Sequence, residues 1–228
     1  MFTQLARNLM QKALRGFFQS LMRFAPEDTH LEVERKFRIA EAEVAAIRTR
    51  LSALLFEHFG DATLADTFLP SPVKGEMMRV RRETLNGHTG VLLTYKTWVA
   101  TPDGGKERQE AEHPTRPLIA SLLIILGRLV QGGPLLGFSK ERSLFRGAYG
   151  PGEVVVGIDQ VVGLGRFSGH YVEIEIMVPH ADRESAGAAK SAIYEVAEKI
   201  FGEAREDVKQ SYLDMLIAAR AEHETVAV

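Results

Sequence analysis

Charged and apolar residues alternate along the segment LEVERKF, residues 31–37. Because successive side chains of a strand point to opposite faces, Glu32, Glu34 and Lys36 would share one face. Carboxylates bind hard divalent cations such as Mg²⁺ or Mn²⁺, and ammonium groups bind phosphate oxygens. The simpler interpretation for one strand alone is a charged face exposed to water.

The same alternation recurs in other segments, and together they favour a different interpretation. If the apolar faces of the strands pack against helices, all the charged faces turn to the other side of the sheet, which in a closed sheet is the lumen. Burying so many charges is costly unless water, metal or ligand satisfies them. We therefore predict a cavity for a ligand that carries several phosphates and a metal ion. The charges concerned are Arg79 and Arg81; Arg108, Glu110 and Glu112; Lys140 and Arg142; Glu173 and Glu175; and Lys96, which ends its strand.

Hydrophobic spacing and turn residues predict the elements that would position these charges. The pair Asn86-Gly87 between two apolar runs predicts a hairpin, and Pro102 to Gly105 predicts a turn. About eight strands with helices between and after them indicate an α+β fold, an antiparallel sheet or barrel with helices packed outside. The predicted strands are 31–39, 66–68, 77–84, 91–100, 107–113, 138–145, 153–159 and 171–178, and the predicted helices are 41–59, 117–130, 181–201 and 206–220.

The composition excludes several classes of protein. The 228 residues are 45% hydrophobic and 25% charged, as in an ordinary globular protein, and no apolar run is long enough for a membrane span. A net charge of −2 argues against a nucleic-acid partner. The lack of cysteine excludes a disulfide framework and fits a cytoplasmic location.

The first 25 residues differ from the rest, because apolar residues recur at helical spacing and all the charges are basic. Such a helix could dock on the domain, lie on an anionic membrane, or act as a presequence, in which case the location would be organellar. Pro26-Glu27-Asp28 predicts a linker or turn after it. We predict two units, a basic amphipathic helix within 1–27 and a single domain over 28–222.

Glu32-x-Glu34-x-Lys36 resembles the ExExK signature of the CYTH superfamily, the triphosphate tunnel metalloenzymes. That family includes thiamine triphosphatases, inorganic triphosphatases and class IV adenylate cyclases. Three residues alone are a weak pattern, but the charged pairs named above follow in the family's order. Asp159, Gly163-Leu164-Gly165 and Ser211-Tyr212 also match, so that the resemblance covers about residues 29–217.

The resemblance implies an eight-stranded antiparallel tunnel with charges inside, which hydrolyses a triphosphate compound with Mg²⁺ or Mn²⁺. It implies Lys36, Glu34 and Arg79 as catalytic residues. The implied metal ligands are Glu32, Glu34, Glu173 and Glu175, supported by Asp159 and Glu112. The implied triphosphate ligands are Lys36, Arg79, Arg81, Lys96, Lys140 and Arg142, with Lys209 as a further contact.

Two alternatives remain open. A class IV-type adenylate cyclase would make cyclic AMP from ATP, although His30-Leu31 stands here where some cyclases carry His-Phe further upstream. A non-catalytic module would bind polyphosphate or nucleotide, with the N-terminal helix contacting a membrane. Trp98 could stack on a base or thiazole ring, but packing is the commoner role of one aromatic residue in a strand. We expect a small triphosphate as the partner, no nucleic acid, and a monomer or homodimer.

Overall fold

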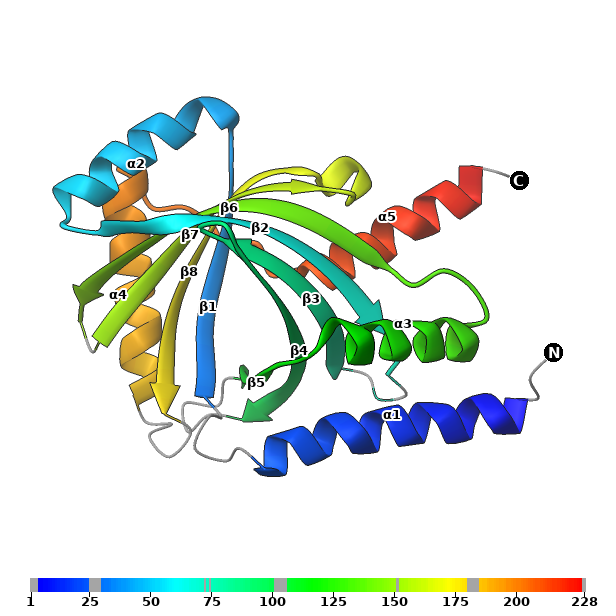
Figure 1. Cartoon of the computed structure of the whole chain (residues 1–228). Helices are drawn as coiled ribbons and strands as arrows, with labels where there is room; N and C mark the ends of the chain where they lie inside the picture. The colour runs from blue at the N-terminus through cyan, green and yellow to red at the C-terminus, as the bar shows by residue number, and fades with distance from the viewer. Residues whose placement is uncertain are drawn as a thin grey trace.

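The computed structural model describes residues 4–24, 30–71, 73, 75–100, 106–150, 152–179 and 185–226. Eight antiparallel strands close into a barrel in the order β1-β5-β4-β3-β2-β6-β7-β8, which confirms the predicted fold class (Figure 1). The strands are β1 (His30–Ile39), β2 (Glu57–Leu69), β3 (Met77–Leu85), β4 (His88–Ala100), β5 (Lys106–Pro114), β6 (Gly137–Tyr149), β7 (Gly152–Val162) and β8 (Gly169–Pro179).

The helices lie outside the barrel in separate groups (Figure 1). They are α1 (Gln4–Phe24), α2 (Val44–Ala53), α3 (Pro117–Gln131), α4 (Ser185–Phe201) and α5 (Tyr212–Val226), with short 3₁₀ turns at Glu41–Glu43 and Gly165–Phe167. Helix α4 covers β1 and β8, and α2 packs beside α4. The outward apolar residues of β1 and β8, such as Phe37 and Val172, form one core with Ile193 and Val196 of α4. The opposite faces of these strands are therefore left for the lumen.

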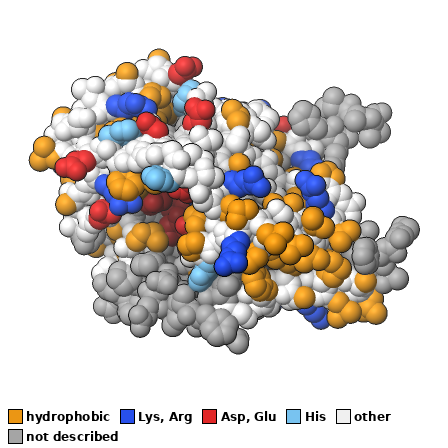
Figure 2. Space-filling model, viewed as in Figure 1, with side chains coloured by type: hydrophobic (Ala, Val, Ile, Leu, Met, Phe, Trp, Pro, Cys, Tyr) orange, Lys and Arg blue, Asp and Glu red, His pale blue; other side chains and the backbone are white. Residues whose placement is uncertain are grey.

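Helices α1 and α3 form the second group, on the side of β4 and β2. Leu14 of α1 is buried in a core with Leu93 and Leu123, and Arg15 donates two hydrogen bonds to Glu76, at 2.9 and 2.7 Å. Hydrophobic side chains also gather on the outer surface over these two helices (Figure 2). In the described part of the chain, no helix is long and apolar enough to cross a membrane.

One predicted helix, 41–59, is wrong over its last six residues, 54–59. The helix ends at Ala53, because Leu55 adopts a left-handed φ of 64° that breaks the helical path. The chain then forms the 13-residue strand β2, of which the predicted short strand 66–68 is only the end. Gly60 lies inside this strand at a register shift against β6.

The predicted helix 206–220 is also wrong at its start, because α5 begins at Tyr212. Ser211 and Asp214 cap it reciprocally, with backbone N–H to side-chain oxygen distances of 3.0 and 3.1 Å. Residues 203–211 instead run beside β1, where the Val208 N–H donates to the Lys36 carbonyl at 2.6 Å. This segment covers an edge left open because β1 pairs with β5 only through His30–Glu32. The turns predicted at 26–28 and 102–105 lie outside the described residues.

Candidate functional site

The barrel encloses a cavity of about 810 Å³ whose lining is rich in both acids and bases. It is large enough for a small molecule. The side chains come from all eight strands, and those from β7 lie near the start of that strand. Helix α5 contributes Tyr212 at one side. The predicted residues that line it are Glu32, Glu34, Lys36, Arg79, Arg81, Lys96, Glu112, Lys140, Arg142, Glu173 and Glu175.

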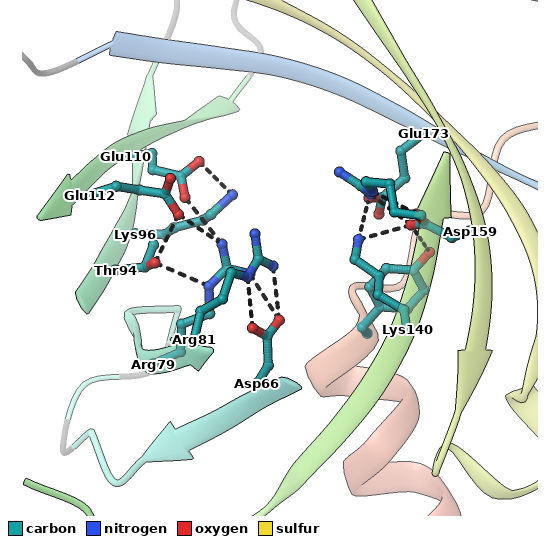
Figure 3. A network of polar contacts seen from close by, with 12 residues as sticks. Asp66, Arg79, Arg81, Thr94, Lys96, Glu110, Glu112, Lys140, Asp159 and Glu173 are labelled. Carbon is teal, nitrogen blue, oxygen red and sulfur yellow. Dashed lines mark hydrogen bonds and ion pairs between the residues drawn. The ribbon is translucent and has the colours of Figure 1, made fainter. Parts of the chain in front are cut away.

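A buried aspartate of β2 holds the two arginines of β3 on one wall of the cavity (Figure 3). Asp66 lies directly opposite Arg81 across the strand pair and accepts two hydrogen bonds from it, at 2.7 and 2.9 Å. Arg79 donates to Asp66 at 3.2 Å and to Glu112 of β5 at 3.1 Å. Burial alone would raise the pKa of Asp66, but the two guanidinium groups hold it well below its ordinary value. The arginines are therefore fixed before any ligand arrives.

The facing wall repeats this design with β6 and β7 (Figure 3). Asp159 is fully buried and accepts hydrogen bonds from Lys140 at 2.8 Å and from two nitrogens of Arg142 at 2.6 Å. Both cations also contact Glu173 of β8. The hydroxyl of Tyr212 donates to Asp159 at 3.2 Å and ties α5 to this wall. Asp159 thus orients the cations and does not itself reach the cavity.

Lys96 of β4 bridges two carboxylates at one side of the cavity. Its Nζ lies 2.5 Å from Glu32 and 2.6 Å from Glu110. Burial raises the pKa of both carboxyls, but Lys96 and a hydrogen bond from Glu110 lower that of Glu32 to about 2. The pKa of Glu110 stays well above its ordinary value because it is buried beside the Glu32 charge. Glu110 therefore holds a proton more tightly than an ordinary glutamate, whereas Glu32 loses its proton more readily.

Lys36 occupies the region between β1 and β8. Its Nζ lies 3.2 Å from Glu173 and 3.8 Å from Glu34, and 3.8 Å from the centre of the Tyr212 ring. The Lys36 ammonium group thus contacts one close carboxylate and the face of one aromatic ring. Lys36 is itself part of the lining of the cavity.

Glu34 and Glu175 are only weakly compensated in the cavity, where Lys36 lies 3.8 Å from Glu34. They lie directly opposite each other across β1 and β8, so the Cβ atoms of two side chains of like charge are about 5 Å apart. Burial raises the pKa of Glu34, and the nearby Glu173 charge raises it further. Burial, with the Glu32 charge, raises the pKa of Glu175 to about 7. A cation between these two carboxylates would relieve both effects.

This carboxylate pair fits the chemistry of Mg²⁺ or Mn²⁺. Within the described residues, no three acidic or histidine side chains converge as a preformed metal cage. Mg²⁺ is commonly held by only one or two carboxylates, together with waters and substrate phosphates. Glu34 and Glu175 offer such a pair, with Glu32 on the same face of β1. The donor set therefore fits a metal that binds together with a phosphorylated ligand.

Lys209 is the predicted residue that the structure sets apart from the barrel cavity. Its side chain is 71% exposed and pairs with Asp207 at 2.6 Å, at a second pocket that shares Glu32, Glu34 and Lys36 with the barrel cavity. The sequence placed Glu110 among the charges that face the lumen but gave it no role, and it did not predict Asp66 or Tyr212 as site residues. Glu110 alternates with Glu112, so its spacing carried the signal, whereas nothing around Asp66 did.

Trp98 lies at the mouth of the cavity and is 48% exposed, unlike a packed strand residue. The guanidinium of Arg108, its cross-strand partner, lies 4.8 Å from the centre of the ring. Gly75 approaches the same ring so closely that a Cβ there would lie 2.9 Å from it. The mouth therefore carries an aromatic surface outside the charged region.

Comparison with known proteins matches this chain to the CYTH domain over residues 30–212. No curated protein sequence matches it. Similar solved structures include a protein of Pyrococcus horikoshii OT3, with 23% identity and a TM-score of 0.60, over 82% of this chain and 98% of that one. A putative adenylate cyclase from Vibrio parahaemolyticus has 19% identity and a TM-score of 0.57, over 82% and 98%. A putative adenylyl cyclase from Hippeastrum, described as having a dominant triphosphatase activity, has 17% identity and a TM-score of 0.54, over 85% and 96%. The TM-scores and the coverage show that these proteins share the fold of this chain.

Proposed function

The chain belongs to the CYTH family, and we propose that it hydrolyses a triphosphate compound inside the barrel with the help of Mg²⁺ or Mn²⁺. The observation that carries this proposal is the pair of cationic walls facing one cavity, each held in place by a buried aspartate. Six bases from four strands, β1, β3, β4 and β6, would neutralise most of the charge of a triphosphate. The candidate substrates are inorganic triphosphate, thiamine triphosphate and nucleoside triphosphates.

The bases would bind and orient the phosphates. Arg79 and Arg81 on one wall, and Lys140 and Arg142 on the other, would hold the chain of phosphates between them, with Lys36 and Lys96 from neighbouring strands. Because aspartates fix these cations beforehand, little reorganisation would be needed as charge develops on the phosphoryl oxygens. Lys36 and Arg79 are our candidates for that stabilisation.

The carboxylates would hold the metal, with Glu34 and Glu175 as its main ligands and Glu32 nearby. Glu173 and Glu112 would act mainly by holding bases, since each is paired with them. When bound, the metal ion supplies charge neutralisation and polarisation of the phosphoryl group. A water would attack the terminal phosphorus in line, forming one P–O bond while the bridging P–O bond breaks, and its proton would pass to solvent.

Hydrolysis is favoured here over cyclisation for two reasons. The His-Phe pair of some cyclases is absent near His30. A relative described as a putative adenylyl cyclase has a dominant triphosphatase activity, which is a precedent for hydrolysis on this fold.

A product analysis tests the proposal. The purified protein is incubated with inorganic triphosphate, thiamine triphosphate and ATP, with Mg²⁺, with Mn²⁺, and with a chelator. We expect metal-dependent release of phosphate from at least one substrate. Release of pyrophosphate with cyclic AMP would instead identify a cyclase, and tight binding of all three without turnover would identify a binding module.

A further inference from the structure

Helices α1 and α3 present a continuous apolar surface to the outside. On α3, the exposed residues recur four, three and four positions apart and so share one face of the helix. Their side chains are 40–71% exposed. On α1, Leu5 and Leu9 are 70% and 59% exposed. We call this surface the α1–α3 face, defined by Leu5, Leu9, Leu118, Leu122, Ile125 and Leu129.

Covering the barrel does not require this surface. Helix α4 also covers strands, yet within the described residues it contributes no large exposed apolar side chain. Helix α3 meets the barrel with its other side, where Ala120, Leu123 and Val130 are buried. The exposed leucines and isoleucine of the α1–α3 face are therefore not needed to pack α3 against the barrel. Contiguous apolar surfaces of this kind mark sites of interaction.

The charges that the two helices of the α1–α3 face carry themselves are all basic. Neither helix contains an aspartate or glutamate. Lys12 of α1 is exposed, as are Arg116 and Arg128 at the two ends of α3. Glu76, the acid bound to α1, is already paired with Arg15 at 2.7 Å. Figure 2 shows hydrophobic side chains with basic ones around them over this part of the molecule.

We propose that the α1–α3 face binds an anionic lipid surface, with both helices lying in the plane of the interface. Exposed leucine and isoleucine would enter the boundary of the acyl chains while lysine and arginine contact the headgroups. A second copy of this chain fits less well. A symmetric dimer would place the same patch on both sides of the interface, so basic residues would meet only basic residues.

The contact would also orient the barrel. Arg15 of α1 binds Glu76, and Glu76 lines the cavity together with Gln131, the last residue of α3. This side of the cavity would therefore lie next to the headgroups. The proposal does not depend on the reaction, because none of the residues of the α1–α3 face lines the cavity.

Vesicle sedimentation tests the proposal on the full chain. The vesicles are phosphatidylcholine alone, or phosphatidylcholine mixed with phosphatidylglycerol, at low and at high salt. We expect binding to the mixed vesicles to be at least about tenfold tighter, and to weaken as salt screens the basic residues. The double variant Leu122→Gln with Ile125→Gln should lose about tenfold in partitioning, because two apolar contacts are removed.

The control is Val162→Gln on β7, where the valine is 50% exposed but belongs to neither helix. It should bind vesicles like the parent, and thermal melting checks that each variant is folded. No binding to mixed vesicles, or equal binding by the double variant, would overturn the proposal. A dimer in light scattering that the double variant dissociates, without vesicle binding, would assign the face to a second copy. Triphosphate hydrolysis in solution should be unchanged in the double variant, so a negative vesicle result leaves the proposed function standing.

Discussion

The cationic walls of the barrel and the carboxylate pair Glu34–Glu175 are both buried, yet they are compensated in opposite ways. On each wall, one aspartate lies opposite an arginine across a strand pair, Asp66 with Arg81 and Asp159 with Arg142. Each aspartate binds a second base two residues away on the same neighbouring strand. Glu34 and Glu175 are also opposite each other, but they carry the same charge.

This difference indicates which part of the site is complete without a ligand. The walls have their counter-charges within the chain, so removing one partner would leave a buried charge uncompensated, and the remaining donors are held ready for phosphate. The pKa values of both carboxyls of the pair are raised because they are buried and lie beside other carboxylates, and the Lys36 ammonium, 3.8 Å from Glu34, offsets this only in part. Residues of the walls should therefore be costly to remove for stability, whereas removal of the carboxylate pair should be costly for activity only.

Breaking a wall should have the largest effect. Asp159→Asn removes the charge that binds Lys140 and Arg142 in a fully buried position. We expect a loss of about 3–5 kcal/mol in the free energy of unfolding, measured by urea denaturation, because buried cations lose their counter-charge. The matched control is Asp61→Asn, whose side chain is 69% exposed, with an expected cost below about 1 kcal/mol. Equal losses in the free energy of unfolding for the two variants would contradict the inference that Asp159 holds Lys140 and Arg142 in place before a ligand binds.

Changing the carboxylate pair should act on catalysis instead. Glu34→Gln keeps the shape of the side chain but removes a charge that would hold the metal. We expect kcat/KM for the best triphosphate to fall about 10²–10³-fold, the cost typical of losing one electrostatic contact in an active site. Glu141→Gln on β6, which is exposed and alternates with the inward bases, is the matched control. If Glu34→Gln retained full activity, the metal assignment would be wrong.

Much of this comparison could be anticipated from the sequence, because alternation along a strand fixes which side chains share a face. Glu32, Glu34 and Lys36 were placed together on that basis, as were the bases of β3 and β6. Asp66 could not be found in this way. It lies in β2, whose sequence EHFGDATLADTFL is poor in β-branched residues, so only 66–68 was predicted as a strand and no second charge alternates with Asp66 there.

The positions of Tyr212 and Lys209 show a second limit to what the sequence can predict. Their position depends on how residues 203–211 run beside β1, which is decided by the open edge of that strand and not by local spacing. Helical periodicity continued the helix back to 206 and therefore gave no reason to separate the two residues. In the structure one contacts Asp159, and the other lies in the second pocket.

In the metal-free protein, removing a charge of the carboxylate pair should raise the free energy of unfolding, whereas removing a charge of a wall should lower it. Glu175 has a pKa of about 7 in the folded chain, above its ordinary value of 4.5. Ionisation therefore costs folding stability progressively as pH rises from about 4.5 to 7, and fully above that. With a chelator present, Glu175→Gln should raise the free energy of unfolding at pH 8 by up to about 3 kcal/mol, and hardly at pH 4.5. Thermal melting across this range checks the result, and a gain independent of pH would contradict it.

The smallest expected effect is that of changing Trp98 at the mouth of the cavity, away from the cationic walls and the carboxylate pair. Trp98 is half exposed beside Arg108 and offers an aromatic surface to the part of a substrate that follows the phosphates. Trp98→Ala should raise KM about tenfold for ATP or thiamine triphosphate, because stacking on a base or ring contributes about 1–3 kcal/mol. Trp98→Phe should restore most of that loss. Inorganic triphosphate serves as the internal control, since it has no ring and its KM should not change. A rise in KM for all three substrates would instead place Trp98 in the support of the charged walls.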